Sequence, residues 1–273
     1  MVQKAFSNHF SFQDATGPIP FGFTNDFMFR AILQQNNNVL KGLICSLLHL
    51  DAENINSVII MNPIELGENI DAKEFILDIR ILLNDNTHIN LEMQVADELN
   101  WSDRSLGYLC RTFDQLCRGQ EYSEAKSVIH IGFLDFTPFS DFPEFYATYK
   151  LKNIKNGHVY SDKFTLCVVN LTQISLATQE DRLYQIDYWA RLFKATTWEE
   201  IKMIAKNNEY LSEASQTLYE MNADEIIQEK CYARLRYTQQ QNSMNRKMNE
   251  LTAENERLTA RIAELETQLK EKA

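Results

Sequence analysis

The hydrophobic positions of the chain change their period several times along its length. Residues 25–49 carry apolar side chains at helical spacing, and Asn25 or Thr24 can cap the start of that helix. Residues 101–119 have the same period, with Gly119 in the position that often follows a helix. Other short apolar or β-branched runs are typical of strands. They are residues 57–64, 75–83, 88–95, 127–135 and 164–171.

An aromatic stretch, residues 142–149, separates the last two of these strands, and the chain from Glu180 onward has a helical composition without strand-like runs. A helix, several strands, a second helix and more strands indicate an α/β (α+β) core with a mixed central sheet flanked by helices. We predict four segments in chain order. They are a loosely structured arm (1–22), the core (23–178), a helical extension (179–240) and a C-terminal coiled coil (241–273).

The last segment has the sharpest periodicity, because apolar residues and one Asn alternate there in steps of four and three. The seam consists of Met244, Met248, Leu251, Asn255, Leu258, Ile262, Leu265 and Leu269. Leucine at successive d positions with Asn255 at an a position resembles a leucine zipper, in which the buried Asn pairs with its own copy. We therefore expect a parallel homodimer through residues 244–269. A trimer and a lone amphipathic helix folded onto the core are the alternatives.

Composition and charge narrow the class of protein. The 273 residues are 44% hydrophobic with 8 Gly and 5 Pro, which suits a packed core. The net charge of -11 argues against holding nucleic acid by overall charge, although a local basic stripe remains compatible with it. The sequence lacks a signal-peptide core, a run of about eighteen apolar residues and a CxxC pair, so we expect a cytoplasmic protein without a membrane segment. Because no glycine-rich phosphate loop is present, we expect no nucleotide cofactor.

Two acidic residues fall opposite each other if two of the strands form a tight hairpin. The triplet Asn84-Asp85-Asn86 separates residues 75–83 from residues 88–95. A three-residue loop pairs Leu83 with Thr87, so the numbers of paired residues sum to 170. Asp78 and Glu92 also sum to 170, which predicts side chains on the same face with Cβ atoms about 5 Å apart.

Two ionised carboxylates in that relation repel each other unless a cation lies between them. Ligands that are all oxygen suit Mg²⁺ or Mn²⁺ better than zinc. The alternative is that Asp78 pairs with Arg80 or a lysine while Glu92 points to solvent.

The arrangement resembles a known family. A strand with Asp, a hairpin and a strand with Glu-x-Lys form the PD-(D/E)xK nuclease signature, and Asp78 with Glu92-Met93-Gln94 is similar to it. Gln94 replaces the lysine and Leu77 replaces the proline, departures that resemble the Rpn family of recombination-promoting nucleases and transposases. The resemblance covers about residues 23–200. The other motifs that carry it are Asn25–Phe29, Asn62-Pro63, Arg104 with Tyr108, Gly119–Tyr122 and Val128–Phe136.

The resemblance implies a metal-dependent DNA endonuclease with a restriction-endonuclease-like core. Asp78 and Glu92 would bind Mg²⁺ or Mn²⁺, with the Met93 carbonyl as a third ligand. Asp26 is a candidate additional ligand. The alternative is a purely structural role, because the helix dipole favours an acidic residue in the first turn. Gln94 can orient a water molecule through its amide, but it cannot act as a base at neutral pH.

DNA contacts are expected from a stripe of arginines. Arg104, Arg111 and Arg118 recur every seven residues on the helix of residues 101–119, opposite an apolar face made of Leu106, Leu109, Cys110, Phe113, Leu116 and Cys117. The alternative is an ordinary solvated helix face. The residues that we expect to contact DNA are Lys73, Arg80, Arg104, Tyr108, Arg111 and Arg118.

The sequence is therefore compatible with three functions. The opposed acids favour a DNA nuclease. The loss of the family lysine and the negative net charge favour a catalytically silent scaffold that binds DNA or protein. A small-molecule phosphodiesterase is disfavoured, because the chain has no nucleotide-binding loop.

Overall fold

The computed structural model describes residues 11–62, 79–114 and 120–272. The chain divides into two compact units, one that ends at Tyr232 and one that starts at Ala233. The helices are α1 (Asp26–Gln35), α2 (Asn37–Leu48), α3 (Trp101–Phe113), α4 (Gln179–Leu183), α5 (Ile186–Lys194), α6 (Trp198–Ala205), α7 (Glu209–Asn222) and α8 (Glu225–Lys272). The strands are β1 (Val58–Ile60), β2 (Ile79–Leu83), β3 (Thr87–Gln94), β4 (Ser127–Leu134), β5 (Tyr146–Lys150) and β6 (Phe164–Asn170).

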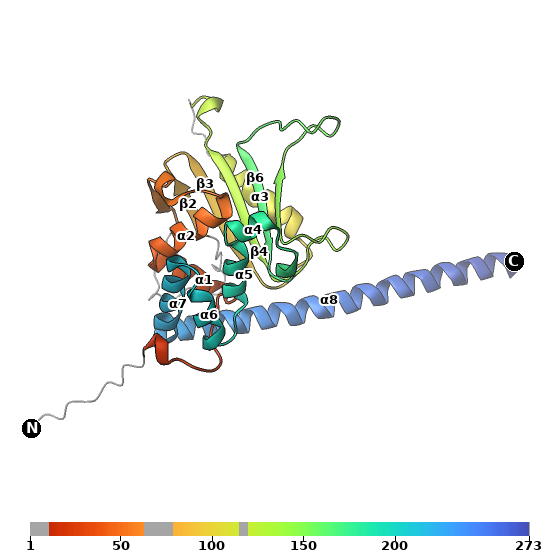
Figure 1. Ribbon diagram of the computed structural model, residues 1–273. Coiled ribbons are helices and arrows are strands. Elements are labelled where there is room, and N and C mark those ends of the chain that lie inside the picture. Colours follow the sequence, from red (N-terminus) through yellow and green to blue (C-terminus); the bar gives the residue numbers. More distant parts are fainter. Residues whose placement is uncertain (1–10, 63–78, 115–119, 273) are drawn as a thin grey trace, which may run out of the picture. The chain divides into compact units, whose positions relative to one another are not determined.

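The strands of the first unit form one mixed sheet in the order β1-β2-β3-β4-β6-β5. Figure 1 labels four of these strands, β2, β3, β4 and β6. The pairs β3–β4 and β4–β6 are parallel, whereas β1–β2, β2–β3 and β5–β6 are antiparallel. This sheet, flanked by helices, confirms the predicted α/β core. Strand β5 lies within the aromatic stretch of residues 142–149 and its continuation, which the sequence analysis did not assign to a strand.

The β2–β3 hairpin has the predicted register. Leu83 pairs with Thr87, and the pairing continues to Ile79 opposite Leu91, so every described pair sums to 170. The turn is tight because Asn84 and Asp85 adopt positive φ angles of 49° and 56°, a region that Asn and Asp tolerate better than most residues. Asp78, the next residue before Ile79, lies outside the described residues.

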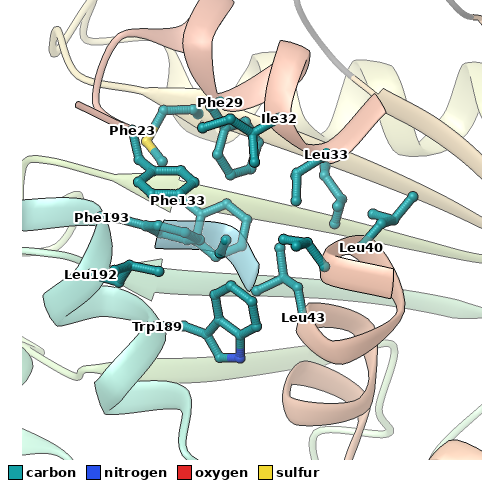
Figure 2. Close-up of a cluster of buried hydrophobic side chains, with 14 of the residues drawn as sticks. Phe23, Phe29, Ile32, Leu33, Leu40, Leu43, Phe133, Trp189, Leu192 and Phe193 are labelled. Carbon is teal, nitrogen blue, oxygen red and sulfur yellow. The ribbon is translucent and has the colours of Figure 1, made fainter. Parts of the chain in front are cut away.

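One face of the sheet packs on aromatic side chains from the helices. Phe133 of β4 makes edge-to-face contacts with Phe29 of α1 and Phe193 of α5, at centroid distances of 5.4 and 5.2 Å (Figure 2). Such pairs add stabilisation beyond the burial of their apolar area. Leu91 and Met93 of β3 belong to the same group of buried hydrophobic side chains. This face therefore holds the main hydrophobic core.

Helix α3 packs against the sheet, but with a different face from the one predicted. Its buried residues are Trp101, Ser105, Leu109 and Thr112, whereas Leu106 is 49% exposed and Cys110 is exposed. The cause is the close approach of Trp101 to Gly132 of β4: a Cβ atom on Gly132 would lie 2.0 Å from the indole. The indole fixes the rotation of the helix.

Helix α3 also ends earlier than residue 119. Asp114 has a non-helical backbone and follows Phe113, the last helical residue. Leu116, Cys117, Arg118 and Gly119 lie outside the described residues.

The helix predicted over residues 25–49 is two helices. Asn25 caps α1 by accepting a bond from the Met28 amide, as predicted. Asn36, with extended backbone, then interrupts the helical path and caps α2, because its side-chain oxygen accepts bonds from the amides of Asn38 and Val39. An internal side-chain cap of this kind competes with continuation of the helix.

The described part of the predicted arm, residues 11–22, is packed rather than loose. Phe12 and Phe21 are each 5% exposed. Pro18 forms a bridge with Thr197, and the Asn222 side chain bonds to both the amide and the carbonyl of Phe21. These contacts tie the segment to α6 and α7.

Helix α8 begins in the first unit, where Ile227 and Cys231 are buried, and supplies the whole second unit. In the second unit the apolar seam is exposed to solvent. The exposed fractions are 64% for Met244, 62% for Met248, 57% for Leu251, 54% for Leu258, 57% for Ile262 and 43% for Leu265. Among the described residues, no helix combines the length and the apolar character that crossing a membrane requires.

Candidate functional site

Three polar side chains of β3 are buried on the face that α3 covers. Asn90, Glu92 and Gln94 are 2, 5 and 7% exposed. They alternate with Leu91 and Met93, which face the aromatic core. Burying polar groups on a central strand costs free energy unless they find partners. The partners of these three side chains therefore define the candidate site.

Arg104 of α3 is the first partner of Glu92. Its Nε and Nη2 atoms lie 2.8 and 2.7 Å from Glu92 Oε1, and a weaker contact of 3.5 Å reaches Glu98. Burial alone would lower the pKa of Arg104, but the negative charge of Glu92 gives a net increase in that pKa. Arg104, predicted to lie on an exposed stripe and contact DNA, is thus half-buried and held by the predicted metal ligand.

His130 of β4 is a site residue that the sequence analysis did not single out. It lies opposite Asn90 in the parallel pairing, with 2.9 Å between His130 Nδ1 and Asn90 Nδ2. Its Nε2 atom is 3.7 Å from Glu92 Oε2. Burial and then the positive charge of Arg104 lower the pKa of His130 to about 3. The only signal in the sequence was one ionisable residue within the apolar run of residues 128–134.

Two aromatic rings enclose His130. Tyr108 stacks parallel to the imidazole at a centroid distance of 5.9 Å, and Trp101 approaches it at 5.6 Å. The guanidinium group of Arg104 lies over the ring of Tyr108, 5.5 Å from the ring centroid. Residues of α3 and two strands therefore form one continuous buried cluster around Glu92.

Gln94 occupies the position of the family lysine. Its Nε2 donates to the carbonyl of Ala96 at 3.1 Å. Within the described residues, the buried oxygens Gln94 Oε1 and Asn90 Oδ1 have no hydrogen-bond partner. The site thus presents amide oxygens in addition to the carboxylate of Glu92.

The other predicted site residues are distributed unevenly. Arg80 is exposed and pairs with Asn90, so it lies beside the buried cluster, and Arg111 is exposed two turns beyond Arg104. Asp26 begins α1. Burial, and after it the negative charge of Asp26, raise the pKa of Cys231 to about 12. Asp78, Lys73 and Arg118 lie outside the described residues.

The donor set fits a hard cation only in part. In the described ranges, no group of three or more His, Cys, Asp and Glu side chains is arranged to hold a metal ion. Glu92 supplies one carboxylate, and the partnerless amide oxygens of Asn90 and Gln94 are on the same face. Oxygen donors of this kind suit Mg²⁺ or Mn²⁺. Within the described residues, Glu92 is the one carboxylate of this polar group on β3.

Comparison with known proteins identifies the family of the chain. A search of curated proteins and a search of solved structures each found no significant match. A family model described as PD-(D/E)XK nuclease family transposase matches residues 23–247, which is most of the chain and includes the sheet, α3 and the buried cluster. The chain therefore belongs to the PD-(D/E)XK nuclease family transposases.

Proposed function

We propose that the protein is an endonuclease that hydrolyses the phosphodiester bonds of DNA with Mg²⁺ or Mn²⁺. Membership of a nuclease family supports hydrolysis of DNA. The metal-dependent mechanism is supported by the register of β2 and β3, which is continuous from Leu83 opposite Thr87 to Ile79 opposite Leu91. If that register continues by one residue, Asp78 faces the buried Glu92.

Asp78 and Glu92 are the proposed metal ligands, with the backbone carbonyl of Met93 as a third and Asp26 as a further candidate. Glu92 supports this role because it is a buried carboxylate with Arg104 as its counter-ion. A bound divalent ion would lower the pKa of a water molecule and neutralise charge that develops on the phosphate.

Gln94 is the proposed water-positioning residue, since its Oε1 is buried two residues beyond Glu92 and can accept a hydrogen bond from water. The amide cannot take up the proton of that water, so the proton must pass to solvent or to the phosphate. We therefore expect slower cleavage than in relatives that carry lysine at this position.

Four of the six proposed DNA contacts, Arg80, Arg104, Tyr108 and Arg111, are within the described residues. Arg80 and Arg111 are exposed and available to phosphates, while the half-exposed Arg104 has to divide its charge between Glu92 and DNA. Tyr108 packs beside Arg104. Lys73 and Arg118 complete the proposed set from outside the described residues.

We also propose that the second unit forms a parallel homodimer through residues 244–269. The support is its exposed seam, since large apolar side chains at heptad spacing gain free energy when a second helix covers them. The proposed contact residues are Leu251, Asn255, Leu258, Ile262 and Leu265. Sedimentation of a chain that lacks residues 240–273 should give a monomer, and an unchanged oligomer would refute the assignment.

A catalytically silent DNA- or protein-binding scaffold is the second candidate function. Two observations favour it: Arg104 already neutralises Glu92, and the Gln94 amide nitrogen is turned to the carbonyl of Ala96. A silent scaffold would bind DNA without needing a divalent ion.

Cleavage of plasmid and linear DNA separates the two functions. The wild-type protein is compared with Glu92→Gln and with Asp103→Asn, a matched loss of one exposed carboxylate on α3. We expect cleavage with Mg²⁺ or Mn²⁺ by the wild type and by Asp103→Asn, and none with EDTA, with Ca²⁺ alone or by Glu92→Gln. Equal cleavage by the wild type and Glu92→Gln, or no cleavage with any ion, would refute the nuclease proposal.

A further inference from the structure

His130 has surroundings that packing alone does not require. The residue is fully buried on β4, where its neighbours Ile131 and Phe133 are apolar and its partner strand places Asn90 beside it. An apolar side chain of similar size would fill this space without the cost of burying a polar ring. The imidazole is therefore best explained by what its two nitrogens contact.

Asn90 determines which nitrogen carries the proton. The amide group of Asn90 donates toward His130 Nδ1 at 2.9 Å. A neutral imidazole has one donor and one acceptor nitrogen, so Nδ1 accepts this bond and the proton resides on Nε2. The N–H group of Nε2 then faces the carboxylate of Glu92.

The two oxygens of Glu92 face two different residues. Arg104 donates twice to Oε1, while His130 Nε2 lies 3.7 Å from Oε2. That distance is longer than a hydrogen bond, and in the described part of the chain Nε2 has no hydrogen-bond partner. A shift of the carboxylate by about 0.8 Å would bring the two atoms to an ordinary hydrogen-bond length of about 2.9 Å.

We propose that His130 is a positioning residue for Glu92: its Nε2–H group, oriented by Asn90, holds Oε2 while Arg104 holds Oε1, so that the carboxylate keeps one orientation toward a divalent ion. The inference rests on the proposed function, because it assumes that Glu92 is a metal ligand. Outer-shell partners of this kind commonly change metal affinity by about 10- to 100-fold.

Two amide substitutions test the proposal because they differ in reach by one methylene group. His130→Gln can still place an N–H group near Glu92, whereas His130→Asn keeps a polar group beside Asn90 but is too short to reach Oε2. His88→Gln, on the same strand as Asn90 and outside the cluster, is the matched control. Calorimetric titration of the DNA-free full-length proteins with Mn²⁺ measures the affinity.

We expect Mn²⁺ affinity to fall about tenfold in His130→Asn and to stay within about threefold of wild type in His130→Gln and His88→Gln. Nitrogen-15 spectra of the metal-free wild type should show His130 protonated on Nε2 and unprotonated on Nδ1. This tautomer can be read without metal or activity, and it remains a test if His130→Asn fails to fold. Protonation on Nδ1 would overturn the proposal.

Glu92→Gln in the same titration distinguishes failure of the role of His130 from failure of the metal site itself. If Glu92→Gln abolishes Mn²⁺ binding while folded His130→Asn binds as tightly as wild type, only the role of His130 is refuted. If wild type does not bind Mn²⁺, or binds it no better than Glu92→Gln, the metal site in the proposed function is refuted, and the role of His130 with it.

Discussion

Strand β3 is buried on both faces of the sheet from Ile89 to Gln94, but the two faces contain different chemistry. On one face, Phe133 belongs to a large cluster of buried apolar and aromatic side chains. On the other, Asn90, Glu92 and His130 are as inaccessible to water, yet each is polar. Burial of the first kind stabilises the fold, whereas burial of the second kind costs free energy unless hydrogen bonds and ion pairs offset it. The apolar face therefore contributes most to stability, and the polar face is the one to which the proposed function assigns the chemistry.

The largest expected effect follows from Glu92→Gln on the polar face. Without its charge, residue 92 cannot serve as an anionic ligand, so the cleavage rate should fall on the order of a thousandfold, or about 4 kcal/mol in activation free energy. Initial rates of plasmid nicking in Mg²⁺ measure the loss, and thermal melting checks that the variant is folded. Unchanged rates would contradict a role for the polar face in catalysis.

Phe133→Ala makes the reciprocal change on the apolar face. It removes a fully buried ring that contacts Phe29 and Phe193, which should lower the free energy of unfolding by about 3–5 kcal/mol. Urea denaturation measures this loss. Because Phe133 does not face the buried cluster, the cleavage rate per folded molecule should match wild type. A lower rate per folded molecule would contradict the separate roles of the two faces.

Gly132→Ala should affect stability and activity together. The added methyl group would collide with Trp101, so we expect a loss of about 1–3 kcal/mol in stability and a displacement of α3 with Arg104. Denaturation and cleavage rates should both change. Gly107→Ala, on α3 with open space around the new Cβ atom, is the control and should change neither by more than a small amount.

The smallest effect is expected from Arg111→Gln at the exposed edge of α3. Loss of one phosphate contact should weaken DNA binding a few-fold and reduce the slope of log affinity against log salt by about one. Fluorescence anisotropy in Ca²⁺ at several salt concentrations measures both values. Arg182→Gln on α4 is the control, and an equal change in that variant would show a general charge effect instead of a specific contact.

Local rules predicted the features that depend on neighbouring residues. The length of the Asn84-Asp85-Asn86 turn set the register of β2 and β3, and the capping side chain of Asn25 set the start of α1. The break at Asn36 was missed, because apolar residues at helical spacing continue on both sides of it. There, one side chain that caps the following helix decided the outcome.

Features that depend on distant residues could not be predicted in this way. The buried face of α3 is set by the fit of Trp101 over Gly132, and the surroundings of His130 arise from the parallel pairing of β4 with β3. Nothing within a few residues of either position records these contacts. The sequence therefore predicted roles for Glu92 and Arg104, but neither their mutual contact nor the position of His130 of β4 beside Glu92.

The ion pair between Glu92 and Arg104 has a consequence for the life of the protein before it meets its substrate. Since the carboxylate has a counter-ion supplied by its own chain, we expect the first unit to fold without a metal ion. Newly made protein should then persist where free divalent ions are scarce. A chelator should remove the proposed capacity to cut DNA and leave the native structure intact.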